Sequence, residues 1–164
     1  MPDFQKGPNY TTPFGRNQWL RSTQDVKTES YTFAASGIPE ETIDGSVQKV
    51  LQPGTVLAKI TSGPDAGKVG VFSSLATDGR ETAGNIVGIC NTFAPWQLLE
   101  RDIEVAAVYE ATGVQAWCLE YVDEGVYNDG AGGGVANGNE IAVPLSDTTA
   151  DAMRGLKTLD IMFA

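Results

Sequence analysis

Apolar and polar side chains alternate with a period of two from about residue 49 onward. The runs "TVLAKIT" (55–61) and "KVGVFS" (68–73) are rich in β-branched residues, and the "SGPDAG" between them has the composition of a hairpin loop. The run "NIVGICNTF" (85–93) is more continuously apolar, as expected of a strand covered on both faces. The pattern therefore predicts three strands, with the third near the centre of a sheet.

The next segments predict two more strands. "DIEVAAVYE" (102–110) and "GVQAWCLEY" (113–121) flank Ala111-Thr112-Gly113, which we expect to form a tight turn. The glycine- and asparagine-rich stretch 125–139 has too few apolar residues to build a core, and we expect a surface loop there.

The end of the chain predicts an edge strand, a short helix and a last strand. "EIAVPL" ends at Pro144, which cannot donate a hydrogen bond to a sheet. Asp147 and Thr148 suit the start of a helix, and Gly155 suits its end. "KTLDIMF" is apolar, so we expect it to close the chain as a buried strand.

Residues 1–46 differ from the rest in composition. They are rich in Thr, Ser, Gln, Asn, Gly and Pro and show no sustained period, which predicts an extended N-terminal arm ahead of a β-rich domain over 47–164. Within the arm, "SYTFAASGI" (30–38) places Tyr31 and Phe33 on one side of a potential strand. Such a segment can add to the sheet edge of another protein or pack on its own domain, and both remain open.

Composition disfavours several classes of partner and catalytic site. The 164 residues carry 21 acidic and 11 basic side chains, a formal net charge of −10, which disfavours binding to a phosphate backbone. The chain has no histidine, which removes Ser-His-Asp and Cys-His catalysis and histidine-based metal sites. No signal peptide and no long apolar run are visible, so we expect synthesis in a cytoplasm and no membrane partner.

The chemical motifs are weak. "GPDAGKV" (63–69) resembles a phosphate loop, but three residues rather than four separate its glycines, Val69 follows Lys68, and a strand follows instead of a helix. We therefore expect a turn. The two cysteines, Cys90 and Cys118, each lie in an apolar run, and we expect free, buried thiols.

Carboxylates occur in pairs, at Asp102 with Glu104 and at Asp123 with Glu124. General acid–base catalysis needs one carboxyl in an apolar pocket, and no such pocket is evident, so we expect no catalytic residue. A weak calcium site is the alternative use of acidic and amide side chains near the glycine-rich loop, and its ligands would be Asp123, Asn128 and Asp129. We expect no metal and no cofactor.

The three tryptophans suggest contact surfaces. Trp117 lies in a predicted strand, in the core or in a subunit interface. Trp96 lies in a connection between strands that must be covered by its own domain or by a neighbouring subunit, together with Phe93, Leu98 and Leu99. Trp19 belongs to the arm and is a candidate anchor on a partner.

The order "PGTVLAKIT … GKVGVF … ETAGNIVGICNTF … DIEVAAVYEATGVQAWCL … TADAMRGLKTLDIMF" resembles the head decoration proteins of lambda-type tailed phages. The resemblance covers about residues 47–164. The chain departs from that family in its longer arm and in the insertion at 125–139. The resemblance implies a mostly β, compact decoration-protein domain (β-tulip or β-clip-like) with one short C-terminal helix and an extended N-terminal arm.

The same resemblance implies a function. Members of the family bind the outside of the expanded phage head as homotrimers at three-fold and quasi-three-fold sites, where they stabilise it against DNA pressure. The implied partner is the major capsid protein, and the implied location is the outer capsid surface of the virion. The candidate capsid contacts of the arm are Trp19, Tyr31, Phe33 and Ile38. The candidate subunit interface consists of Phe93, Trp96, Leu98 and Trp117.

Two other interpretations stay open. The chain could be another virion structural protein, such as a head fibre or a tail component. It could also be a carboxylate-based hydrolase, because β-clip-like folds also host trimeric nucleotide hydrolases and a fold does not determine a function.

Overall fold

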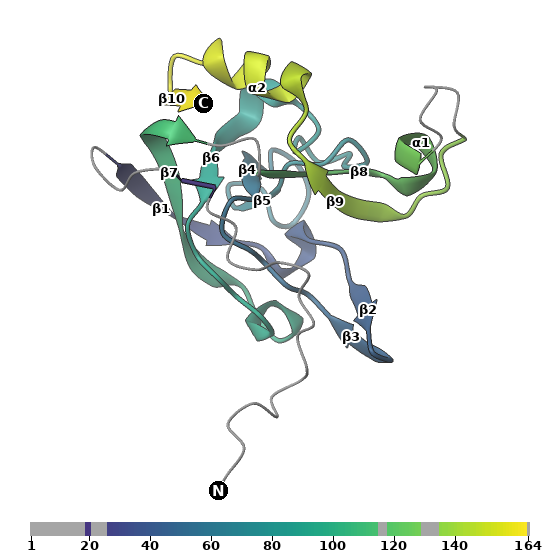
Figure 1. The fold of residues 1–164 in the computed structure, drawn as a ribbon. Helices are drawn as coiled ribbons and strands as arrows, with labels where there is room; N and C mark the ends of the chain where they lie inside the picture. The colour runs from purple at the N-terminus through teal and green to yellow at the C-terminus, as the bar shows by residue number, and fades with distance from the viewer. Residues whose placement is uncertain (1–18, 21–25, 115–117, 129–134, 164) are drawn as a thin grey trace, which may run out of the picture.

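The computed structural model describes residues 19–20, 26–114, 118–128 and 135–163. In these residues the chain is mostly β, with one sheet of six strands and two sheets of two (Figure 1). The strands are β1 (Lys27–Phe33), β2 (Glu41–Ile43), β3 (Ser46–Gln48), β4 (Val56–Lys59), β5 (Val69–Val71), β6 (Ile86–Cys90), β7 (Ile103–Val114), β8 (Leu119–Asp123), β9 (Glu140–Pro144) and β10 (Asp160–Phe163). The α-helices are α1 (Glu124–Asn128) and α2 (Asp147–Arg154), and the 3-10 helices are η1 (Ala35–Gly37), η2 (Ala83–Asn85) and η3 (Gln97–Leu99).

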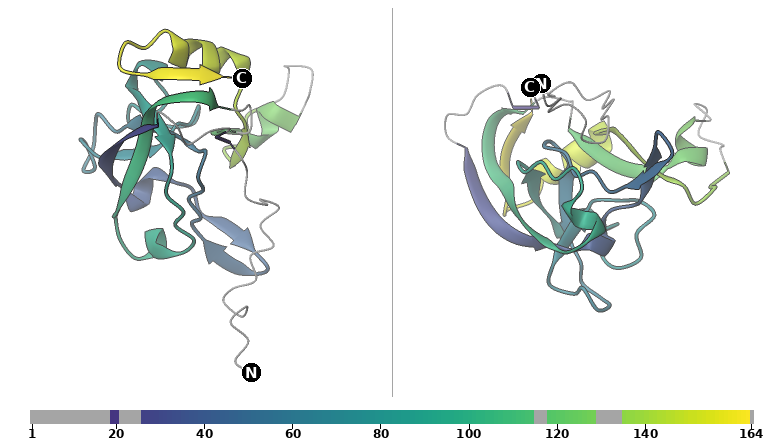
Figure 2. Two further views of the ribbon diagram at one scale, coloured as in Figure 1. Left: turned by 60° about the vertical axis from the view of Figure 1, so that its left-hand side comes forward. Right: turned by 90° about the horizontal axis from the view of Figure 1, so that it is seen from below.

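The large sheet closes on itself. Its strand order is β1-β5-β4-β6-β7-β10, and β1 also pairs with β7, so five strands form a closed ring with β10 as an extension. β1 and β7 run antiparallel and side by side from Lys27 opposite Glu110 to Phe33 opposite Ile103 (Figure 2). Closure leaves none of these five strands with a fully unpaired edge.

The predicted hairpin and the predicted central strand are confirmed. β4 and β5 pair antiparallel across the "SGPDAG" turn, and β6 lies between β4 and β7. β9 and β10 also form where the sequence predicts strands, and Pro144 sits at the end of the β8–β9 ladder opposite Leu119.

The predicted tight turn at Ala111-Thr112-Gly113 is wrong, because β7 continues through it as one strand of 12 residues. Its far half has partners that the local sequence does not reveal. Ala111 pairs with Ile161 and Thr112 with Met162 of the parallel strand β10, and Val114 forms a bridge with Leu20. These pairings hold the segment extended despite the glycine.

All five strands of the ring contribute to the interior core, and β4, β6 and β7 also contribute to a second core on the outer face. Along β4, Leu57 belongs to the core inside the ring, whereas Val56 and Ala58 belong to the core on the outer face. The same alternation places Ala107 inside and Val108 outside. A strand buried on both faces is continuously apolar, which explains the composition of these runs.

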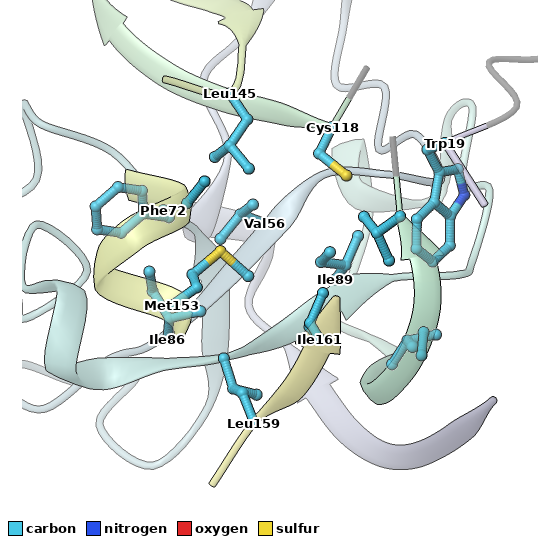
Figure 3. Packing of buried hydrophobic residues seen from close by; sticks show 14 of the residues in the cluster. Trp19, Val56, Phe72, Ile86, Ile89, Cys118, Leu145, Met153, Leu159 and Ile161 are labelled. Carbon is cyan, nitrogen blue, oxygen red and sulfur yellow. The ribbon is translucent and has the colours of Figure 1, made fainter. Parts of the chain in front are cut away.

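The outer core is covered by α2 and β10. Met153 of α2 and Ile161 of β10 point toward Ile86 and Ile89 of the sheet (Figure 3). The N-cap lies one residue before the predicted capping pair, since the side chain of Ser146 accepts a hydrogen bond from the Thr149 nitrogen at 3.2 Å. Gly155 ends the helix as predicted.

The structure differs from the predicted arm in the described residues 26–46, which belong to the folded domain. β1 is part of the ring, β2 and β3 form a hairpin, and the expected boundary after residue 46 falls inside β3. Asp44 and Gly45 have φ angles of 51° and 79°, the conformation of a tight hairpin turn. This Asp-Gly pair was the available signal for β2–β3. Residues 1–18 and 21–25 of the predicted arm lie outside the described residues.

Candidate functional site

Three of the four predicted arm contacts are buried in the chain's own core. Trp19 is 4% exposed, Phe33 is 0% exposed and Ile38 is 4% exposed. Trp19 packs on the outer core beside Gly54, whereas Phe33 and Ile38 belong to the core inside the ring. Tyr31 is half-buried and pairs with Val105 of β7. In this arrangement β1 is not free to join another protein's sheet.

Energetics explain why β1 stays with its own domain. Moving Phe33 out of the core would cost roughly 1.5–3 kcal/mol for its side chain alone. Pairing with β7 also supplies main-chain hydrogen bonds without the loss of translational freedom that binding to another molecule entails. Binding of β1 to the sheet edge of another protein would have to compensate for both the lost burial of Phe33 and the lost pairing with β7.

Side-chain contacts add to this pairing. Thr32 donates to a carboxylate oxygen of Glu104 at 2.6 Å, and Lys27 donates to Glu110 at 2.8 Å. Just after β1, the backbone nitrogen of Ala35 donates to Asp102 at 2.8 Å. The pair Asp102 and Glu104, considered as a possible acid–base pair, thus holds β1 and the turn that follows it.

Lys68, the lysine of the predicted turn 63–69, has a structural role as well. Its ammonium contacts Asp65 and Asp102, each with an N–O distance of 2.6 Å. The backbone hydrogen bond from Ala35 and the charge of Lys68 lower the pKa of Asp102. A general acid needs a raised pKa, so this shift is opposite to that requirement.

The glycine-rich loop is anchored by Asp123, whose carboxylate accepts hydrogen bonds from backbone nitrogens of Asn137 at 3.1 Å and Gly138 at 2.8 Å. These bonds occupy oxygens that the calcium interpretation required. No cluster of three or more His, Cys, Asp or Glu side chains suited to a metal occurs in the described part of the chain. Asp129 lies outside it.

The predicted subunit interface is partly exposed. Phe93 is 51% exposed and Trp96 is 48% exposed, whereas Leu98 is fully buried. The side chain of the next residue, Leu99, is 44% exposed and faces the solvent. We call residues 91–102 the apolar loop. Trp117 lies outside the described residues.

The apolar loop is held firmly although its large side chains face outward. Leu51 and Ala94 exchange two backbone hydrogen bonds of 2.9 Å, and the side chain of Thr92 accepts a hydrogen bond from the Ala106 nitrogen at 2.9 Å. Leu98 anchors the loop in the core inside the ring. Exposed aromatic side chains on a fixed backbone form a preorganised contact surface, because little ordering remains to be done on binding.

Sequence reasoning missed Arg80. Its side chain is buried, and its guanidinium contacts Asp78 at 3.0 Å and two backbone carbonyl groups, those of Gly37 at 3.0 Å and Val71 at 3.3 Å. A lone arginine in a loop, beside Asp78 and Gly79, carries no local signal of burial.

The thiols agree with expectation. Cys90 and Cys118 are free and buried, as predicted. None of the helices in the described ranges is long and apolar enough to cross a bilayer. No protein family, curated protein or solved structure matched this chain in the comparisons.

Proposed function

We propose that this chain is a capsid decoration protein that binds the outside of the expanded phage head as a trimer at three-fold and quasi-three-fold sites. The observation that carries the proposal is the apolar loop, which presents Phe93, Trp96 and Leu99 to solvent on a chain of net charge −10. The order of motifs over 47–164, shared with lambda-type decoration proteins, supports it. So does the mostly β architecture with one C-terminal helix of two turns before the last strand.

The apolar loop suits a subunit contact. Such a surface on a strongly acidic protein favours association through apolar burial, since like charges oppose approach elsewhere. Tryptophan is enriched among residues that dominate binding energy, and Trp96 lies between two further apolar side chains in sequence. In a cyclic trimer each loop would pack against a different surface of the next subunit.

The proposal assigns the capsid contact to residues before Trp19. The segment 30–38 is used inside the domain, whereas residues 1–18 carry the aromatic side chains Phe4, Tyr10 and Phe14 in a polar sequence. Three such segments on one trimer act together, and linking weak contacts raises the overall affinity by factors of about a hundred or more.

The trimer is tested by replacing Phe93 and Trp96 together with serine and measuring the mass in solution by light scattering. We expect the native chain at three times the mass of one chain and the double variant at the mass of one. Tyr127→Ser is the matched control, because Tyr127 is an equally exposed aromatic residue on α1. A double variant that remains trimeric contradicts the loop as subunit contact.

Capsid binding is tested separately by mixing the native protein with undecorated, expanded heads of the phage that encodes it and imaging them by electron microscopy. We expect added density at the three-fold positions. Imaging of complete virions that places the protein on the tail or in a head fibre would contradict decoration and favour another structural role.

A further inference from the structure

A groove with both polar and apolar lining lies at the end of the ring where β6 begins, whereas the apolar loop follows the end of β6. Its volume is about 480 Å³, within the range of roughly 300–1,000 Å³ typical of small-molecule sites. Its lining includes side chains from β1, β4 and β7, from η2 and from the segment before β10, namely Glu29, Tyr31, Lys59, Asn85, Tyr109 and Thr158.

Strand alternation places two of the lining residues on the inner face of the ring, whereas Tyr109 packs against the outer core. Tyr31 faces the same side of β1 as the buried Phe33, and Lys59 faces the same side of β4 as the buried Leu57. The groove therefore lies at the rim of the ring, between the interior core and the outer core. The mouths of closed sheets are frequent ligand sites.

Two of the polar groups are already oriented by neighbours. The hydroxyl of Tyr31 donates to a carboxylate oxygen of Glu29 at 2.8 Å, and burial together with this bond raises the pKa of Tyr31 to about 12. The amide nitrogen of Asn85 donates to the carbonyl oxygen of Gly79 at 2.8 Å. Glu29 keeps its second oxygen, and Asn85 keeps its amide oxygen, as acceptors for a ligand.

The charges of the groove cancel. Glu29 and Lys59 are its two ionised side chains, in a protein of net charge −10. An anion would meet Glu29 and the overall negative field, and a cation would meet Lys59. The lining instead combines two phenol rings with donors and acceptors of both kinds, which suits a neutral ligand that has apolar C–H faces and many hydroxyls.

We propose that this groove binds a neutral sugar unit of a glycan, with the rings of Tyr31 and Tyr109 against its C–H faces and with Glu29, Lys59 and Asn85 hydrogen-bonded to its hydroxyls. The proposal does not rest on capsid decoration, because the groove lies at the other end of the ring from the apolar loop.

The experiment is saturation-transfer NMR of the full chain with millimolar glucose, galactose, N-acetylglucosamine, maltose, lactose and chitobiose, and with glucuronic acid as the charged comparison. We expect at least one neutral sugar to receive saturation. Lys59→Ala, which truncates an exposed side chain, and Tyr109→Ala should each weaken its affinity by about tenfold or more. Tyr127→Ala, outside the groove, should leave it unchanged.

Three results would overturn the proposal. They are no saturation of any neutral sugar, tighter binding of glucuronic acid than of every neutral sugar, and binding that survives both Lys59→Ala and Tyr109→Ala. Because Tyr109 also packs against the outer core, the melting temperature of each variant is measured first, and Lys59→Ala decides alone if Tyr109→Ala does not fold.

Discussion

The guanidinium of Arg80 donates from Nη1 to the carbonyl oxygen of Gly37 at 3.0 Å, across 43 positions of sequence. This contact joins the turn after β1 to the segment that follows β5. It is possible because the backbones of Gly37 and Gly70 lie against each other, leaving no room for a side chain on either. The closure of the ring near β1 thus depends on two glycines and one buried arginine.

Replacing Arg80 tests this junction. Arg80→Met removes the donors to Gly37 and Val71 and leaves their carbonyl oxygens without this partner. We expect the free energy of unfolding to fall by about 2 kcal/mol, measured by urea denaturation. Arg101→Met, at an exposed position of the apolar loop, is the matched control and should change it far less. Equal effects of the two variants would contradict the role of Arg80.

The glycine contact makes a second prediction. A Cβ atom at residue 70 would lie 2.7 Å from the Gly37 Cα atom, so Gly70→Ala forces two backbone segments apart. We expect a loss of roughly 1–3 kcal/mol in the free energy of unfolding. Gly84→Ala is the control, since its Cβ atom would meet nothing closer than 3.9 Å. The measurement is the melting temperature of each variant, which should fall for Gly70→Ala and stay unchanged for Gly84→Ala. An unchanged melting temperature of Gly70→Ala would show that the two backbone segments can move apart without loss of stability.

Asp102 should contribute to the loss of stability in acid. Its pKa is lowered in the folded protein by the Ala35 nitrogen and by Lys68. A carboxyl group whose pKa is lowered in the folded state stabilises the fold at pH values above its ordinary pKa of 3.8. This stabilisation is lost as the pH falls through the folded-state pKa. In Asp102→Asn we therefore expect a lower urea midpoint at neutral pH and a smaller further decrease on acidification. Asp151→Asn, an exposed aspartate on α2, serves as control, and an unchanged acid response in Asp102→Asn would contradict the assignment.

The two thiols should be unreactive in the folded protein. Burial raises the pKa of Cys90 to about 12 and that of Cys118 to about 12, so the reactive thiolate is scarce and shielded. We expect a thiol reagent such as dithionitrobenzoate to label neither cysteine in buffer and both in concentrated urea. Labelling of either thiol in buffer as fast as in urea would contradict its burial.

Truncations distinguish the folded part of the N-terminal region from the rest. Deleting residues 1–40 removes β1 together with Phe33 and Ile38, opens the ring and exposes the interior core, so we expect an unfolded chain by circular dichroism. Deleting residues 1–18 leaves every contact described above in place, and we expect cooperative unfolding to persist. Capsid binding at full occupancy by the chain that lacks residues 1–18 would contradict the assignment of the capsid contact to these residues.

The local pattern was sufficient where an element depends on its own residues. The β4–β5 hairpin follows from two alternating runs around a Gly-Pro-Asp turn, and α2 follows from capping residues and a terminal glycine. The buried thiols follow from their apolar surroundings. In the candidate subunit interface, Phe93 and Trp96 are exposed as an interface requires, but the sequence did not distinguish Leu98, which is buried, from Leu99, which is exposed.

Tertiary structure alone decided which strands meet. The sequence predicts a strand over residues 30–38, but the strand ends at Phe33 and a 3-10 helix follows at Ala35–Gly37. The partner of such a strand can be any free edge, and only the folded chain shows that it is β7. In the same way Ala111-Thr112-Gly113 has the composition of a turn, yet pairing with β10 keeps it extended. Strand propensity is a property of neighbouring residues, whereas pairing, closure of the ring and the groove at its mouth arise from contacts between segments far apart in the chain.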